Sequence, residues 1–184
     1  MSSEAWLATR KGLFKVDGSD SYWKIVGRSF GGDNVSIVAV GVSIGGVYVT
    51  RDGGESLKAM CSGLRAEYVL PEQAEDSAAQ DPHLIAPCAA EPDTIWTQHH
   101  NGVFVTRNGC VRWEKIDPST FGFAVAVHPK GGNMAWLVPG IKDELRIPVD
   151  GKFVVTKTTD GGKSWKKLSN GLPKEDFWVS EDAG

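Results

Sequence analysis

The residues best suited to chemistry are four histidines and the carboxylates near them. Asp81 and His83 flank a proline, and His99 stands next to His100. Imidazole and carboxylate groups can ligate a metal or donate and accept hydrogen bonds. The histidine spacing is irregular, and neighbours on a strand point to opposite faces. We therefore predict a hydrogen-bonding role for His83 and His100 in a polar pocket, with no metal and no cofactor; a plain turn at Asp81–His83 is the alternative.

A tyrosine beside a carboxylate is a second candidate for chemistry. Tyr68 follows Glu67 directly, and a tyrosine activated by a glutamate can act as a nucleophile. Adjacent residues on an extended chain point in opposite directions, which separates the two groups. We assign no catalytic residue on this basis.

Composition limits the kinds of protein that could hold these residues. The 184 residues carry a net charge of −3, with 41% hydrophobic and 23% charged side chains, as in one soluble domain spanning 1–184. No basic surplus is present for binding nucleic acid, and no apolar run suits a membrane span. Three cysteines without a C-x-x-C motif and an acidic amino terminus favour free thiols and a cytoplasmic location.

A short strand pattern recurs four times and organises the chain. A turn residue precedes an alternating apolar strand at 12–16, 46–50, 102–106 and 152–156. A second short strand lies upstream of each copy and a polar turn with a third strand lies downstream. No window of ten residues has helical periodicity, so we predict an all-β chain. The blade-like repeats are expected at about 5–26, 35–60, 84–116 and 123–168, with a closing strand at 177–180.

The polar turns carry the most specific motif. Residues 158–165 fit Ser/Thr-x-Asp-x-Gly-x-Ser/Thr-Trp at every position, and residues 50–57 fit except for a final Leu. Residues 106–113 keep only the ends of the pattern. An Asp carboxylate can accept backbone N–H groups in such a turn, a Gly can take positive φ and the Trp can pack beneath. We predict a structural role for the following motif residues: Asp52, Gly54, Asp160, Gly162, Ser164 and Trp165.

This motif is the Asp-box, and the chain resembles the BNR/Asp-box β-propellers, in particular bacterial sialidase-like proteins (exo-alpha-sialidase or glycosyl hydrolase BNR-repeat). The similarity also covers 7–14, 80–83, 98–102 and 123–129. It implies a β-propeller of four-stranded antiparallel blades, with Asp-box turns between the third and fourth strands and away from the ligand face. Relative to the family, the chain is expected to be shortened, with about four blade-like repeats.

The propeller order implies which side chains share the loop face opposite the Asp-boxes. Arg146 precedes Ile and Pro, as does the sialidase arginine that holds a substrate carboxylate, although Leu145 replaces the aromatic residue and the segment lies late in the chain. The predicted ligand-binding residues on this face are Arg10, Tyr68, Asp81, His83, Gln98, His100, Glu144 and Arg146.

The resemblance implies a propeller that binds a small or carbohydrate-like ligand without full glycosidase activity. The alternatives are a non-catalytic protein-interaction scaffold and a sialidase-type glycosidase completed by a partner chain. An open row of blades would expose strand edges. We therefore expect a homo-oligomer, with a dimer favoured, and neither nucleic acid nor membrane as a partner.

Overall fold

The computed structural model describes residues 3–9, 12–19, 22–29, 35–36, 40–42, 44–51, 56–116, 122–140 and 153–172. In these ranges the regular structure consists of β-strands and two single-turn 3₁₀ helices, η1 (Pro71–Gln73) and η2 (Ser77–Ala79). The all-β prediction is confirmed. No helix of the described part is long and apolar enough to cross a membrane.

The strands form four antiparallel sheets, and within each sheet they follow one another in chain order. The first sheet contains β1 (Ser3–Thr9), β2 (Gly12–Ser19) and β3 (Tyr22–Ser29). The second contains β4 (Val35–Ser36), β5 (Val40–Val42), β6 (Gly46–Val49) and β7 (Lys58–Ala59). The third contains β8 (Pro82–Cys88), β9 (Glu91–His99), β10 (Gly102–Thr106) and β11 (Glu114–Lys115). The fourth contains β12 (Gly122–Val127), β13 (Ala135–Pro139), β14 (Val155–Thr158) and β15 (Lys166–Leu168).

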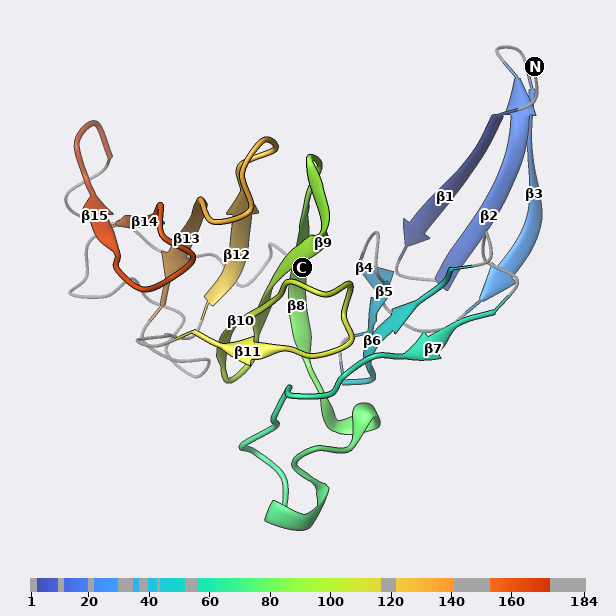
Figure 1. Ribbon diagram of the computed structural model, residues 1–184. Helices are drawn as coiled ribbons and strands as arrows, with labels where there is room; N and C mark the ends of the chain where they lie inside the picture. Colours follow the sequence, from blue (N-terminus) through green and yellow to red (C-terminus); the bar gives the residue numbers. More distant parts are fainter. Residues whose placement is uncertain are drawn as a thin grey trace.

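The sheets stand next to one another in the order of the chain, from the first sheet at the right of Figure 1 to the fourth at the left. Consecutive strands pair antiparallel, which gives each sheet the up-and-down connectivity of a propeller blade. Among the described residues, no strand pairing joins the first sheet to the fourth. Closure into a ring therefore stays a prediction.

Two hydrophobic clusters fill the spaces between neighbouring sheets. The first joins the second and third sheets through Val47, Cys61, Phe104 and Trp113. The second joins the third and fourth through Trp96, Val103 and Leu137, among others. Alternating strands place apolar side chains on both faces of the third sheet, which is therefore covered on each side. The third sheet is consequently the best packed part of the described chain.

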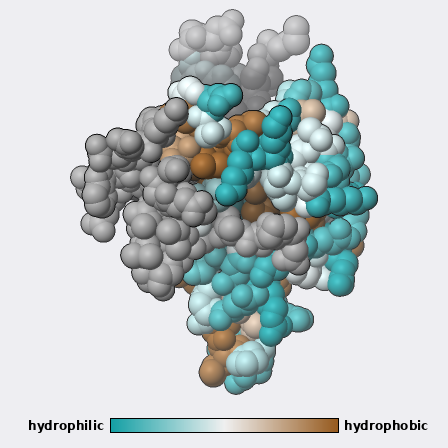
Figure 2. Space-filling view, turned by 90° about the vertical axis from the view of Figure 1, so that its left-hand side faces the viewer, coloured by the Kyte–Doolittle hydropathy of each residue, from teal (hydrophilic) through white to brown (hydrophobic). Residues whose placement is uncertain are grey.

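The connection from β7 to β8 projects from the bottom of the molecule in Figure 1 and carries both 3₁₀ turns. Gln80 anchors it, because its buried amide donates to the carbonyls of Ala74 and Asp76 at 2.9 Å. Its backbone carbonyl accepts from Gly45 and Gly46 of the second sheet. Figure 2 shows the face at the fourth-sheet end, where hydrophobic surface lies near the centre next to hydrophilic side chains and the projecting tip also carries hydrophobic surface. The hydrogen bonds of Gln80 therefore hold the connection, and with it the start of β8, in a fixed position.

Candidate functional site

The turn between β14 and β15 is held by its own side chains. Asp160 accepts the backbone N–H of Ser164 at 3.0 Å, the Ser164 hydroxyl at 2.6 Å and the Thr158 hydroxyl at 2.8 Å. The Thr158 oxygen also accepts the Gly162 N–H at 2.9 Å. Gly161 and Gly162 have φ values of 74° and 95°, which glycine adopts without steric cost. The motif residues present in the described chain therefore build the turn.

The turn between β10 and β11 has the same geometry despite its weaker motif. Asn108 replaces the Asp and accepts the Arg112 N–H at 3.0 Å, while the Thr106 hydroxyl accepts the Cys110 N–H at 3.1 Å. Cys110 takes the place of the second glycine, and its φ is 68°. The sequence had marked 106–113 as a copy that keeps only the ends of the motif; the geometry persists because an amide oxygen and a small buried side chain replace the carboxylate and the glycine.

Hydrogen bonds set the ionisation of Asp160. The bonds from Ser164, followed by that from Thr158, lower the pKa of the Asp160 carboxyl from 3.8 to about 2. The carboxylate is exposed to solvent and bonded within its own turn. It therefore supports the turn, with none of the raised pKa that a general acid needs.

The tryptophans that end the two turns are buried to different extents. Trp113 is 1% exposed and its indole N–H donates to the Met60 carbonyl at 2.8 Å. Trp165 is half-buried, packs edge-on against Trp96 with ring centres 6.2 Å apart, and leaves its buried indole N–H without a partner. Trp113 is the better anchored of the two.

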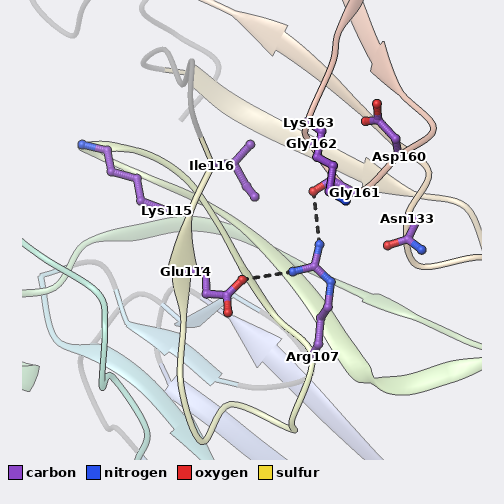
Figure 3. Close-up of a pocket in the computed structure, with 9 residues that line it drawn as sticks. All are labelled: Arg107, Glu114, Lys115, Ile116, Asn133, Asp160, Gly161, Gly162 and Lys163. Carbon is purple, nitrogen blue, oxygen red and sulfur yellow. Dashed lines mark hydrogen bonds and ion pairs between the residues drawn. The ribbon is translucent and has the colours of Figure 1, made fainter.

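In two of the turns, the arginine that follows the threonine reaches the next sheet. Arg51 donates to the Gly109 carbonyl at 2.7 Å, and Arg107 donates to the Gly161 carbonyl at 3.1 Å. Arg107 also bonds Glu114 at 3.3 Å (Figure 3). Arg107, Glu114 and Gly161 line a hollow of about 410 Å³ between β11 and the β14–β15 turn. Because Arg107 and Asp160 are engaged in holding the turn, we assign the hollow a structural role.

At the opposite ends of the strands, four predicted ligand-binding residues meet. We call Tyr68, Asp81, His83 and His100 the loop-face cluster. Asp81 Oδ2 lies 3.4 Å from His83 Nε2 and 3.7 Å from His100 Nδ1. The ring of His100 contacts that of Tyr68 edge-on, with centres 4.8 Å apart. Tyr68 comes from the β7–β8 connection, Asp81 and His83 from the start of β8, and His100 from the β9–β10 turn.

Backbone contacts orient the cluster. Asp81 Oδ1 accepts the Ile44 N–H at 3.3 Å, which leaves Oδ2 facing the two imidazoles. His83 Nδ1 bonds the Gly122 carbonyl at 2.9 Å, so this nitrogen carries a proton and Nε2 faces Asp81. The His83 and Asp81 side chains are 11% and 12% exposed and His100 is 27% exposed. The cluster is therefore mostly buried with its His100 side open.

His99, which was expected on this face but was not among the predicted ligand-binding residues, contacts the backbone beside Asp81 and His100. Its two ring nitrogens face the N–H groups of Asp81 and Asn101, each at 3.1 Å. A neutral imidazole accepts at one nitrogen, so one of these contacts is a hydrogen bond at any time. Burial lowers the pKa of His99 to about 3. His99 thus stays neutral and supports the Asp81 backbone.

The remaining predicted residues are divided between the core and undescribed segments. Gln98 is fully buried, and its amide donates to the carbonyls of His99 and Gly102 at 3.2 and 3.3 Å. It therefore braces the β9–β10 turn beneath the cluster. The predicted residues outside the described ranges are Arg10, Asp52, Gly54, Glu144 and Arg146, together with the expected closing strand at 177–180.

Tyr68 keeps its proton over the physiological range. Burial, and secondarily the charge of Asp81, raise the pKa of its phenol from 10.0 to about 12. The hydroxyl is bonded to the Ala79 carbonyl. Tyr68 therefore offers an aromatic edge and a neutral hydroxyl, which suits binding better than nucleophilic attack.

No protein-family model and no curated protein matches this sequence. Solved structures resemble it in fold. A GH74 enzyme from Niastella koreensis matches with a TM-score of 0.58 and 16% identity over 90% of this chain and 27% of that chain. An ancestral GH74 enzyme matches with a TM-score of 0.51 and 18% identity over 78% of this chain and 19% of that chain. YCF48 from Cyanidioschyzon merolae matches with a TM-score of 0.49 and 19% identity over 90% of this chain and 42% of that chain.

The two GH74 structures, with TM-scores above 0.5, show the fold of this chain to be that of a β-propeller. Their identities below 20% carry no information on activity. The chain spans between 19% and 42% of the lengths of these three proteins. The resemblance to sialidases stays a prediction from the motifs.

Proposed function

We propose that this chain is a ligand-binding β-propeller domain that takes a small polar, carbohydrate-like ligand on the loop-face cluster without hydrolysing it. The observation that carries the proposal is the meeting of Tyr68, Asp81, His83 and His100 at one end of the third sheet. These residues come from three separate stretches of the chain, and the fold brings them together.

The chemistry of the cluster suits a polyhydroxylated ligand. Tyr68 is 41% exposed and can pack against an apolar sugar face, while Asp81 and His100 can bond hydroxyl groups. Neutral His99 and buried Gln98 hold the supporting turn in place. Arg146 and Arg10, predicted on the same face, would add carboxylate recognition if the ligand is an acidic sugar.

The cluster favours binding over glycoside hydrolysis. Glycosidases of the common type place two carboxyl groups about 5–9.5 Å apart across the scissile bond. The loop-face cluster supplies one carboxylate, Asp81, whose Oδ1 is already bonded to the backbone. The protonated phenol of Tyr68 lacks the activation that a nucleophile needs.

Binding can be tested by saturation-transfer NMR with neutral and acidic monosaccharides. Tyr68→Ala and His100→Ala should abolish the transfer signal. Tyr22→Ala, which removes another exposed tyrosine far from the cluster on β3, should leave it unchanged. A fluorogenic sialoside should be hydrolysed no faster than background. A signal that survives both cluster substitutions would refute the proposal, and rapid hydrolysis would favour the glycosidase.

A specific observation favours a second function, a scaffold that assembles with another copy of this chain. Tyr22, Trp23, Ile25 and Val26 on β3 are each 50–61% exposed, an unusual run of large apolar side chains on a solvent-facing strand. Among the described residues β3 pairs on one side only, with β2, so its other edge could pair with a strand of a second copy. Light scattering should show a dimer that Ile25→Lys converts to monomer, whereas a wild-type monomer would exclude this assembly.

A further inference from the structure

We infer that Asp81, His83 and His100 form a binding site for one divalent transition-metal ion of the zinc class. This inference uses the same cluster as the proposed carbohydrate site and does not depend on it. Each residue offers one ligand atom, and these three atoms lie within 4.8 Å of one another. Two imidazoles and one carboxylate form a ligand set that zinc and iron sites use.

The separations between the side chains fit ligands around an ion better than direct partners. A charge-assisted N–H···O bond is normally about 2.7–2.9 Å long. The Asp81 Oδ2 distances to His83 Nε2 and His100 Nδ1 are longer, 3.4 and 3.7 Å. Ligand atoms placed tetrahedrally at about 2.0–2.1 Å from zinc lie roughly 3.4 Å apart. Both pairs are therefore already near coordination distance.

The distance between the two imidazole nitrogens determines how far the side chains must move to bind an ion. The two imidazole nitrogens are no more than 4.8 Å apart. Bringing them to tetrahedral spacing takes a movement of at most about 1.4 Å. His100 lies on the β9–β10 turn and its side chain is 27% exposed, so it has room to rotate toward His83.

The hydrogen bonds that orient His83 and Asp81 are of the kind found around metal ligands. A metal-bound histidine usually donates its other ring N–H to a carbonyl or carboxylate, which fixes the ring and leaves the ligating nitrogen bare. His83 makes this contact through Nδ1 to the Gly122 carbonyl at 2.9 Å. Asp81 is likewise oriented by the Ile44 N–H on Oδ1, which directs Oδ2 to the triad. Two of the three ligands are therefore held in place by the backbone.

The sequence alone pointed away from this site, because the spacing from 81 to 83 to 100 matches no metal motif. The fold supplies the proximity, since β8 begins at the same end of the third sheet as the β9–β10 turn. An ion held there would present a Lewis acid to oxygen atoms of a ligand on the loop face.

The test is calorimetric titration of Zn²⁺ into the full chain after treatment with a chelator. We expect one ion per chain, and at least a 10-fold loss of affinity in His83→Gln, His100→Gln and Asp81→Asn, the last of which keeps an acceptor for Ile44. His128→Gln is the matched control, because His128 Nδ1 instead accepts the Lys130 N–H at 3.2 Å on another sheet. It should bind Zn²⁺ as the wild type does.

Two outcomes would overturn the proposal. One is the absence of stoichiometric Zn²⁺ binding to the wild type, and the other is a loss of affinity in His128→Gln equal to that in the three cluster variants. Circular dichroism establishes that each variant folds. If His83→Gln does not fold, the more exposed His100→Gln decides, and unchanged affinity there also rejects the site. Repeating the saturation-transfer measurement with the monosaccharides in the presence of Zn²⁺ and then of chelator separates this inference from the proposed function, since either interaction can be lost while the other persists.

Discussion

The β14–β15 turn and the loop-face cluster lie at opposite ends of the strands and are assembled from different distances along the chain. The side-chain bonds of Thr158, Asp160 and Ser164 that shape the turn all join residues between 158 and 164, and one further bond, from Arg107 to the Gly161 carbonyl, comes from the third sheet. In the cluster, Asp81 meets His100 and His83 bonds Gly122, a residue 39 positions away. The turn is built by residues that are close in the sequence, whereas the cluster forms only after the sheets have packed. Stability and binding should therefore respond to different substitutions.

The largest effect should come from the tryptophans beneath the turns. Trp113→Ala should lower the free energy of unfolding by about 3–5 kcal/mol, because it empties a buried aromatic site and leaves the Met60 carbonyl unpaired. Trp165→Ala should cost less, since Trp165 is half-buried and its N–H has no partner. Urea denaturation of both variants measures the difference, and equal losses would contradict the ranking. Neither variant should change Zn²⁺ affinity when folded.

The local part of the structure could be predicted from sequence and the tertiary part could not. The strand Gly102–Thr106 was predicted with its observed bounds, because alternation and a preceding turn define it. β14 begins at Val155 instead of 152, since the turn threonine that ends the strand fixes its register. Tyr68, Asp81, His83 and His100 were expected on one face, but their distances depend on packing that no spacing in the sequence records.

Sequence reasoning also missed the links between neighbouring turns. Arg51 and Arg107 follow equivalent threonines, and this shared position was the available signal. Their partners are carbonyl groups of Gly109 and Gly161, which every residue type possesses. A pattern of side chains cannot reveal a contact whose acceptor is backbone. The motif alignment places Cys110 at the position of Gly162, but it did not show that Cys110 keeps the positive φ of that glycine.

Gly162→Ala should have the second largest effect. Gly162 has φ 95°, and an added Cβ would lie 2.6 Å from the Ile116 side chain. Strain at such a position typically costs about 1–3 kcal/mol, and Ile116 would also have to move within the second hydrophobic cluster. Thermal denaturation gives the loss. Gly171→Ala is the control for positive φ alone, because nothing lies within 4 Å of its added Cβ; equal losses at both positions would remove the packing argument.

Acid should weaken the β14–β15 turn selectively. Folding lowers the Asp160 pKa from 3.8 to about 2, so the stabilisation is fully present above the unfolded pKa and is lost as pH falls through the folded value. The difference in unfolding free energy between wild type and Asp160→Asn should therefore shrink between about pH 4 and pH 2. The β10–β11 turn carries a neutral Asn108 instead, so Asn108→Ala should show the same difference at both pH values. A constant difference for Asp160→Asn would mean that the charge does not support the turn.

The smallest effect is expected at Cys110, where two contributions oppose each other. Its φ of 68° is costly for a residue with a Cβ, by roughly 1–2 kcal/mol, and glycine would remove that strain. The same substitution removes a side chain that is 1% exposed and packs in the first hydrophobic cluster. Burial of a group of this size contributes a similar free energy, so the free energy of unfolding of Cys110→Gly should lie within about 1 kcal/mol of the wild-type value. Cys110→Ala keeps the strain and loses the sulfur, and should therefore be less stable than Cys110→Gly in the same urea titration. The reverse order would show that packing outweighs backbone strain in this turn.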